Sequence, residues 1–204
     1  MTLPENAYCT LAEIRQRLSL TAVDTAGDTM LKTIITSVSR WIDDFTWRRF
    51  YAATETRYYK AEESDQIFID DILSVSTLKT DDNADRTYET TWATTDYDLL
   101  PVNAALDGVP YTMISITPNG SYGFPKGVSK GVQLVGSFGY CATTSSGKAT
   151  IIKEACLLQS ERIYKRKDSP MGVAGVSALG VQTLKVPGLD PDVQMMLDPF
   201  RRLV

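Results

Sequence analysis

A helical repeat of apolar residues in the first quarter of the chain constrains the fold most. The apolar residues recur every three or four positions over four turns: Leu31, Ile34, Ile35, Val38, Trp41, Ile42 and Phe45. Because this stripe is wide, we expect the helix to pack against at least two partners. Asp24 or Asp28 should begin it. A shorter helix should precede it over Leu11–Leu18, where Thr10 and Glu13 have capping-box spacing.

A second long helix is predicted from Ala149 to Lys167, ended by Asp168-Ser169-Pro170. Ile152, Ala155, Cys156 and Ile163 share one of its faces. Its second half is basic and carries Arg162, Lys165, Arg166 and Lys167. These cations suit the negative end of a helix, and they suit contacts with phosphate equally well. The sequence leaves both interpretations open.

The chain ends in a short element that has its own start signal. Asp190 can cap a helix whose first residue is Pro191, and Pro199 should end that helix. Its apolar side chains fall at helical spacing: Val193, Met196, Leu197 and Phe200. A run rich in Gly, Ala and Val, residues 171–180, precedes it and is expected to be a flexible linker. Such an element is suited to docking, either on its own core or on another chain.

Between the long helices the pattern changes to short stretches rich in β-branched and aromatic residues, separated by Asp, Asn, Gly and Pro. The expected strands are Thr56–Lys60, Gln66–Asp70, Ile72–Leu78, Tyr111–Thr117 and Val132–Phe138. They predict a small, mostly antiparallel β-region of about five or six strands.

Together these elements predict an α+β fold. It would be an antiparallel-type bundle of three main helices with an inserted small antiparallel β-region and a short C-terminal helix on a flexible linker. The expected parts are residues 1–53 (N-terminal helical part of the core), 54–142 (β-rich insertion), 143–168 (long core helix) and 169–204 (linker and C-terminal docking segment).

Composition argues against conventional catalysis. The 204 residues include no histidine, which excludes Ser-His-Asp and Cys-His nucleophile systems and the common zinc sites. No apolar run approaches the roughly 20 residues of a membrane span. Cys9, Cys141 and Cys156 are widely spaced, so we interpret them as reduced thiols that act as small apolar residues, without a paired thiol. We expect no catalytic residue, no cofactor and no metal site.

Acidic residues are concentrated in the β-region. Residues 51–100 carry twelve acidic side chains against four basic ones, whereas the whole chain carries 25 against 21. Asp81, Asp82 and Asp85 lie in one predicted exposed loop. Such a loop is usually a solvated surface. The alternative is an acidic surface that faces a passing polyanion and prevents it from sticking.

Two further clusters of residues allow either a structural or a functional interpretation. Asp70 and Asp71 follow other acids and could belong to a small metal-dependent hydrolase, although a charged loop is the more common explanation. The aromatic residues Trp41, Phe45, Trp47, Phe50 and Tyr51 could stack on single-stranded nucleic acid, but we expect most of them to pack in the core.

The order of motifs resembles the head–tail adaptor (connector, or head-completion) proteins of tailed bacteriophages, prophages and gene-transfer particles. The N-terminal part is similar in its Leu-x-Glu-x-(Arg/Lys)-x-x-Leu opening, here Leu11–Leu18, and in an aromatic and basic run, here Trp41–Tyr51. The C-terminal part is similar in its Pro-(Met/Leu)-Gly linker after a helix, here Ser169–Gly172, and in its terminal Pro-(Phe/Tyr)-Arg-Arg motif, here within Asp198–Leu203. The β-region is longer than in compact members of the family.

This resemblance implies a structural virion protein made in the bacterial host cytoplasm and located in the capsid–tail neck. It would form a ring, usually twelve-fold, beneath the portal protein, extend the DNA channel and contact the next neck or tail protein. DNA would pass through without sequence-specific binding, and no membrane would be involved. The residues that the resemblance assigns to portal docking are Leu197, Pro199, Phe200, Arg201, Arg202 and Leu203. The side chains that could face the channel or DNA are Arg162, Lys165, Arg166, Lys167, Asp81, Asp82 and Asp85.

Other classes of protein remain open at this point. A tail-completion or tail-terminator protein would share the symmetry but bind the tail tube. A small metal-dependent hydrolase would use the carboxylates near Asp70. A stand-alone nucleic-acid binder fits poorly with a sequence pI of about 4.9.

Overall fold

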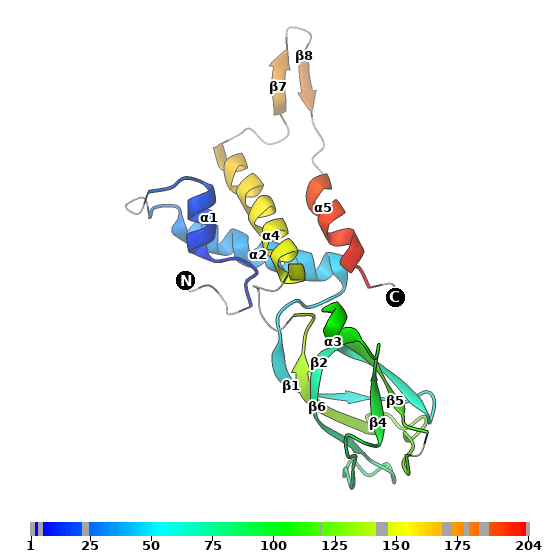
Figure 1. Cartoon of the computed structure of the whole chain (residues 1–204). Coiled ribbons are helices and arrows are strands. Elements are labelled where there is room, and N and C mark those ends of the chain that lie inside the picture. Colours follow the sequence, from blue (N-terminus) through cyan, green and yellow to red (C-terminus); the bar gives the residue numbers. More distant parts are fainter. Residues whose placement is uncertain are drawn as a thin grey trace. The chain divides into compact units, whose positions relative to one another are not determined.

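Two compact units divide the chain. The computed structural model describes residues 3, 6–21, 25–118, 120–141, 147–168, 173–177, 180–183 and 188–202. The helical unit joins Met1–Arg48 to Gly147–Val204, and the β unit is the segment Arg49–Ser146 between them. Both helices and an antiparallel sheet are present, which confirms the α+β class (Figure 1). None of the described helices combines the length and apolar character needed to cross a membrane.

The helical unit is built around helix α4. Its elements are α1 (Leu11–Arg17), α2 (Asp28–Thr46), α4 (Gly147–Lys165), the 3-10 turn η1 (Arg166–Asp168), α5 (Pro191–Leu197) and the 3-10 turn η2 (Asp198–Phe200). Helix α4 packs against α1, α2 and α5. It therefore joins the N-terminal and C-terminal parts of the chain in one core.

Helix α2 begins at Asp28, the later of the two predicted starts. The predicted stripe is buried at Leu31, Ile34, Ile35, Val38 and Ile42. The predicted burial of the aromatic residues is wrong at two positions, because Trp41 is 42% exposed and Trp47 is 68% exposed. Trp41 lies at the edge of the stripe. Trp47 adopts a left-handed conformation (φ 55°, ψ 33°) that ends the helix, and this turn directs its ring into solvent.

The two short helices begin as their sequence signals predict. Thr10 and Glu13 form the capping box of α1. Asp190 caps α5 by accepting the Asp192 backbone N–H, and Pro191 is the first helical residue. Pro199 lies in the 3-10 turn that follows α5, so regular α-helix ends before it.

The segment between α4 and α5, predicted as a linker, contains an antiparallel hairpin. Its strands are β7 (Val173–Ser177) and β8 (Gly180–Thr183). These strands carry a weak sequence signal, because Gly and Ala, which are poor strand formers, are interspersed there with Val.

The β unit is a six-stranded antiparallel sheet with one short helix. Its elements are β1 (Ala53–Tyr59), β2 (Gln66–Thr80), β3 (Thr90–Thr91), β4 (Tyr97–Leu100), α3 (Ala104–Asp107), β5 (Tyr111–Ile116) and β6 (Val132–Phe138). The strand order is β1-β6-β2-β5-β4, and β3 pairs with the end of β2. A buried cluster fills the unit and includes Ile67, Ile72, Leu78, Ile114, Leu134 and Phe138. Within this cluster the rings of Trp92 and Phe124 stack, with their centres 4.7 Å apart.

Strand β2 makes this sheet larger than the sequence predicts. Two strands were expected, over Gln66–Asp70 and Ile72–Leu78, but one continuous strand of 15 residues forms. Its first half pairs with β5 and its second half with β6, with register shifts around Ile72 and Val75. These irregularities bend one strand between two neighbours. The predicted small β-region is therefore wrong in size, and the sheet is a substantial part of the fold.

Gly136 in β6 marks the point where bulged β2 comes closest. A Cβ at this position would lie 2.3 Å from the Ser74 carbonyl oxygen and 2.7 Å from Ile72 Cδ1. Backbone atoms cannot move aside as a flexible side chain does. Only glycine fits here without shifting the pairing of β6 with β2.

We predict that Gly136→Ala lowers the free energy of unfolding by about 2–3 kcal/mol, because the new methyl group overpacks the sheet. Gly123→Ala is the matched control in the same unit, since its Cβ would lie an ordinary 3.5 Å from the nearest atom. Urea unfolding followed by tryptophan fluorescence measures both. Equal effects of the two substitutions would contradict the proposed clash.

Candidate protein-binding surface and acidic loop

The C-terminal segment packs on its own helical unit. Leu197 and Phe200, both candidates for docking, are buried there. The Arg202 backbone N–H donates to the Thr46 carbonyl at 2.9 Å. Arg48 Nε donates to the Phe200 carbonyl at 2.8 Å. The end of α2 therefore holds the chain through Arg202, and the two buried apolar side chains stabilise this unit.

The remaining docking candidates differ in exposure. Pro199 and Arg201 are exposed and Arg202 is half-buried. The Arg201 guanidinium lies over the Phe45 ring, 5.1 Å from its centre. This contact orients the side chain while leaving its charge accessible. Leu203, the last candidate, lies outside the described residues.

An open groove lies between α2 and the start of α5. It has a volume of about 320 Å³ and is lined by Trp41, Asp44, Phe45, Gly188, Leu189 and Gln194. The Trp41 ring lies beside Gly188, where an added Cβ would be 3.5 Å from it. Met195 on α5 is 71% exposed. The Trp41 and Phe45 rings line this α2–α5 groove, and the Arg201 guanidinium lies over Phe45. The groove is a candidate surface for binding another protein. This groove could not be predicted from sequence, because helical spacing does not reveal the exposure of Trp41.

The basic residues of α4 are largely engaged within the helical unit. Arg162 forms ion pairs with Asp190 and Asp192 of the α5 start. Lys165 pairs with Glu161, one turn earlier. The hydrogen bond from Lys165 lowers the pKa of Glu161, and a smaller effect in the same direction comes from the hydrogen bond with Arg17 of α1.

Two exposed candidates follow the end of α4, Arg166 and Lys167. Lys167 donates to the Tyr164 hydroxyl at 3.0 Å. Arg166 is exposed in η1. The structure thus gives Arg162 a role in joining two helices, whereas Arg166 keeps its charge at the surface.

The three candidate aspartates of the β unit lie in one loop but have different environments. Asp81 is fully buried and accepts backbone N–H groups from Asp85 at 3.2 Å and Arg86 at 2.9 Å. Asp82 and Asp85 are exposed. The prediction of an exposed loop is therefore wrong at Asp81, whose carboxylate holds the loop in shape.

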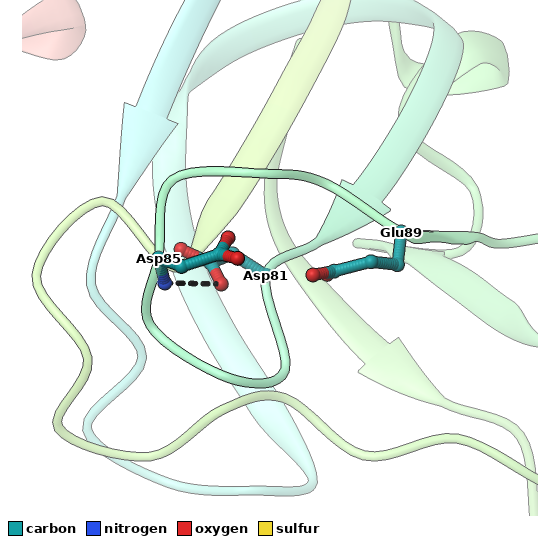
Figure 2. Close-up of side chains that lie close together, drawn as sticks. All are labelled: Asp81, Asp85 and Glu89. Carbon is teal, nitrogen blue, oxygen red and sulfur yellow. Dashed lines mark hydrogen bonds between the residues drawn. The ribbon is translucent and has the colours of Figure 1, made fainter.

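Figure 2 shows Asp85 and Glu89 beside Asp81 in this acidic loop. One oxygen of each lies within 4.8 Å of the others, a spacing compatible with a cation. The hydrogen bonds of Asp81 already account for its position, and the Asp85 carboxylate accepts the Thr87 N–H at 2.7 Å. Clusters of this kind commonly stabilise loops without an ion.

The carboxylate pair considered for a hydrolase has other partners. Asp70 forms an ion pair with Arg57 at 2.7 Å and accepts the Tyr59 hydroxyl at 3.0 Å. Burial, reinforced by the Asp70 charge, raises the pKa of that tyrosine. Arg57 also pairs with Glu55 at 2.8 Å. Asp70 thus belongs to a structural network on β1 and β2.

We predict that Asp81→Asn lowers the free energy of unfolding by about 1–3 kcal/mol. Asp85 and Arg86 donate to different carboxylate oxygens, and an amide replaces one of these acceptors with an NH2 donor. Asp82→Asn, which changes an exposed neighbour, should change it by less than about 0.5 kcal/mol. Chemical denaturation measures both. A calcium-dependent rise in melting temperature that Asp81→Asn abolishes would contradict this assignment and identify the loop as a cation site.

Comparisons with known proteins give a structural likeness without a sequence family. No protein-family model matches the chain, and no curated protein matches it. A chain in the neck of an empty GTA particle computed with C6 symmetry has a similar fold, with a TM-score of 0.58 and 16% identity; the match covers 100% of this chain and 94% of that one. A chain in the virion of a native gene transfer agent (GTA) particle gives a TM-score of 0.54 and 15% identity, with the same coverage of 100% and 94%.

Proposed function

We propose that this protein is a structural component of the neck of a phage-like particle. The observation that carries the proposal is the likeness over the whole chain to a GTA neck chain, with both units included in the match. The sequence motifs that resemble head–tail adaptors support it independently. The role is mechanical: the protein joins the capsid to the neck or tail and performs no catalysis.

Within the neck we propose the adaptor position. Copies of the chain form a closed ring beneath the portal protein, and the ring extends the DNA channel toward the next neck or tail protein. Ring closure requires contacts between two different surfaces of neighbouring copies. The GTA neck chain belongs to an assembly computed with C6 symmetry, in keeping with a ring. Twelve-fold is the number that the family resemblance implies.

Portal docking is assigned to the exposed part of the C-terminal segment and to the α2–α5 groove. Leu197 and Phe200 support this surface from beneath, since both are buried. Pro199 and Arg201 are exposed beside it, and Arg is a frequent interface anchor. Arg202 and Leu203 continue the segment. An apolar groove bordered by a fixed cation suits a partner with an apolar side chain next to a carboxylate.

A tail-completion or tail-terminator protein is the alternative within the same particle. Such a protein would use the same kind of ring and the same surface but bind the tail tube. Purified capsids with portals and purified tail tubes, offered separately, distinguish the two positions. Binding to neither would return the small metal-dependent hydrolase to consideration.

We predict that Arg201→Glu weakens binding to portal-bearing capsids roughly 10- to 100-fold, because it places a like charge against the partner's carboxylate. The substitution leaves the buried side chains of α5 and η2 in place, whereas deletion of residues 197–204 would remove Leu197 and Phe200 from the core. Co-sedimentation with capsids that lack necks measures the affinity.

The matched control for this experiment is Arg166→Glu, which reverses an exposed arginine of the same unit at the end of α4. It should bind capsids like the wild-type protein. Equal binding by wild type and Arg201→Glu would remove Arg201 from the docking surface.

The β unit has two possible places in such a ring. It can line the channel, where its acidic residues would repel DNA, or lie at the periphery and brace neighbouring copies or the capsid. We favour the periphery for most of it, because the β-region is longer than in compact adaptors. The acidic loop is the part to test for the channel position, since Asp82 and Asp85 are exposed.

If the acidic loop faces the channel, Asp82→Asn combined with Asp85→Asn should slow genome release several-fold without affecting ring assembly, because less repulsion lets DNA adhere to the wall. Asp81 is left intact because it stabilises the loop. Glu62→Gln with Glu63→Gln provides the control, since these exposed acids lie elsewhere in the same unit. Release is followed by the fluorescence of a DNA-binding dye. Unchanged kinetics would place the loop outside the channel.

A further inference from the structure

Two of the three cysteines are in contact, contrary to the interpretation of them as isolated thiols. The Sγ atoms of Cys9 and Cys156 are 3.4 Å apart, although the residues are separated by 147 positions in sequence. Both side chains are buried, with Cys9 3% and Cys156 0% exposed. Cys9 precedes the N-cap of α1 and Cys156 lies in the middle of α4. Their contact joins the two separated segments of the helical unit.

The N-terminal segment that carries Cys9 is held in place on α2. The Tyr8 backbone N–H donates to Ser39 Oγ at 3.0 Å. That same Oγ lies 3.7 Å from Cys156 Sγ. Arg40 donates to the Asn6 carbonyl at 2.8 Å. These contacts fix the direction from which Cys9 approaches α4.

Ion pairs between α1 and α4 hold the other side of the contact. Lys153 pairs with Glu13 at 3.1 Å. Arg17 reaches Glu154 and Glu161, each at 2.6 Å. The two sulfur atoms are thus kept together by groups on both sides, which gives each thiol a high effective concentration at the other.

We propose that Cys9 and Cys156 form an intrachain disulfide that covalently joins the N-terminal segment to α4 under oxidising conditions. The oxidant is a low-molecular-weight disulfide, RSSR. The thiolate of Cys9 attacks one sulfur of RSSR, forms a mixed disulfide and releases RS⁻. The Cys156 thiolate then attacks Cys9 Sγ, forms the protein disulfide and releases the second RS⁻. Two protons leave the protein thiols and protonate the two leaving groups, so two thiols are oxidised and one RSSR is reduced to two RSH.

The folded protein protects this pair from immediate oxidation. The hydrogen bond between the two thiols, together with burial, raises the pKa of Cys9, and the same hydrogen bond lowers the pKa of Cys156. Because both sulfur atoms are buried, a disulfide in solution reaches neither of them in the closed structure. Reaction therefore begins when residues 6–10 lift from α2 and expose Cys9. Cross-linking should be slow compared with oxidation of an exposed cysteine. It should also be selective for the partner that Cys9 meets when the segment returns.

Formation of this disulfide depends on the redox conditions around the protein. Thiols stay reduced in a bacterial cytoplasm and are oxidised outside it. This setting, unlike the chemistry, rests on the proposed function: a neck subunit would assemble as a dithiol and gain its covalent link after the particle leaves the cell.

Peptide mapping of the purified full-length protein tests the chemistry directly. The protein is incubated with oxidised glutathione or with dithiothreitol, alkylated, and digested with trypsin without reduction. Trypsin places the three cysteines on different peptides, residues 1–15, 131–148 and 154–162. The expected product is a linked pair of peptides 1–15 and 154–162, absent after dithiothreitol. Peptide 131–148, which contains Cys141, should stay unlinked.

Melting temperature gives the second measurement. A disulfide that closes so long a loop should raise the melting temperature of the oxidised wild type by about 5–15 °C over the reduced protein. Cys9→Ala should abolish both the link and this difference, whereas Cys141→Ala, the matched control in the β unit, should keep both. The comparison of oxidised with reduced wild type stands even if one variant folds poorly.

Three results would overturn the proposal: no linked peptide after prolonged incubation, a link that includes Cys141, or a disulfide between two chains. None of them bears on the neck assignment, which depends on capsid binding. Conversely, a protein that cross-links as expected but binds no capsid would keep this inference and remove the proposed function.

Discussion

The packing of α4 against α1, α2 and α5 is the interaction on which the helical unit depends. It brings together segments that the whole β unit separates in sequence. Burial of side chains such as Ile35 and Ile152 stabilises this core by about 2–3 kcal/mol each. The ion pairs between α1 and α4 are partly exposed, so each contributes only about 0–1 kcal/mol. Apolar contact therefore provides most of the stability, and the charges fix the register of α1 on α4.

The helices could be predicted from sequence because their signals are local. The apolar period of α2 and the Asp190-Pro191 start of α5 need no knowledge of the rest of the chain. The sheet was predicted less well. Whether Gln66–Thr80 makes one strand or two depends on its neighbours, since β5 pairs with one half and β6 with the other. A bulge that keeps a strand continuous leaves little trace in its own residues.

The burial and partners of the candidate residues could not be read from sequence, and for a similar reason. Sequence places Asp81, Asp82 and Asp85 in one acidic loop, yet only the fold turns Asp81 inward to accept two N–H groups. Sequence also marks Phe200 and Arg201 as one docking motif, whereas the fold buries the first and exposes the second. The contact between Cys9 and Cys156 could not be predicted, because it joins residues that are 147 positions apart in sequence. A GTA neck chain with 16% identity has a similar fold over the full length of this chain. Such a fold therefore requires few identical side chains.

The discontinuous helical unit has a consequence for the order of folding during synthesis. Helix α2 ends at Thr46, but α4, against which it packs, begins at Gly147. At roughly 5–20 residues per second, a ribosome needs about 5–20 s to make the intervening chain. The β unit is complete before α4 emerges and can fold first. During that interval the apolar stripe of α2 lacks its main partner, so the nascent chain presents a binding site for a chaperone that the finished protein conceals.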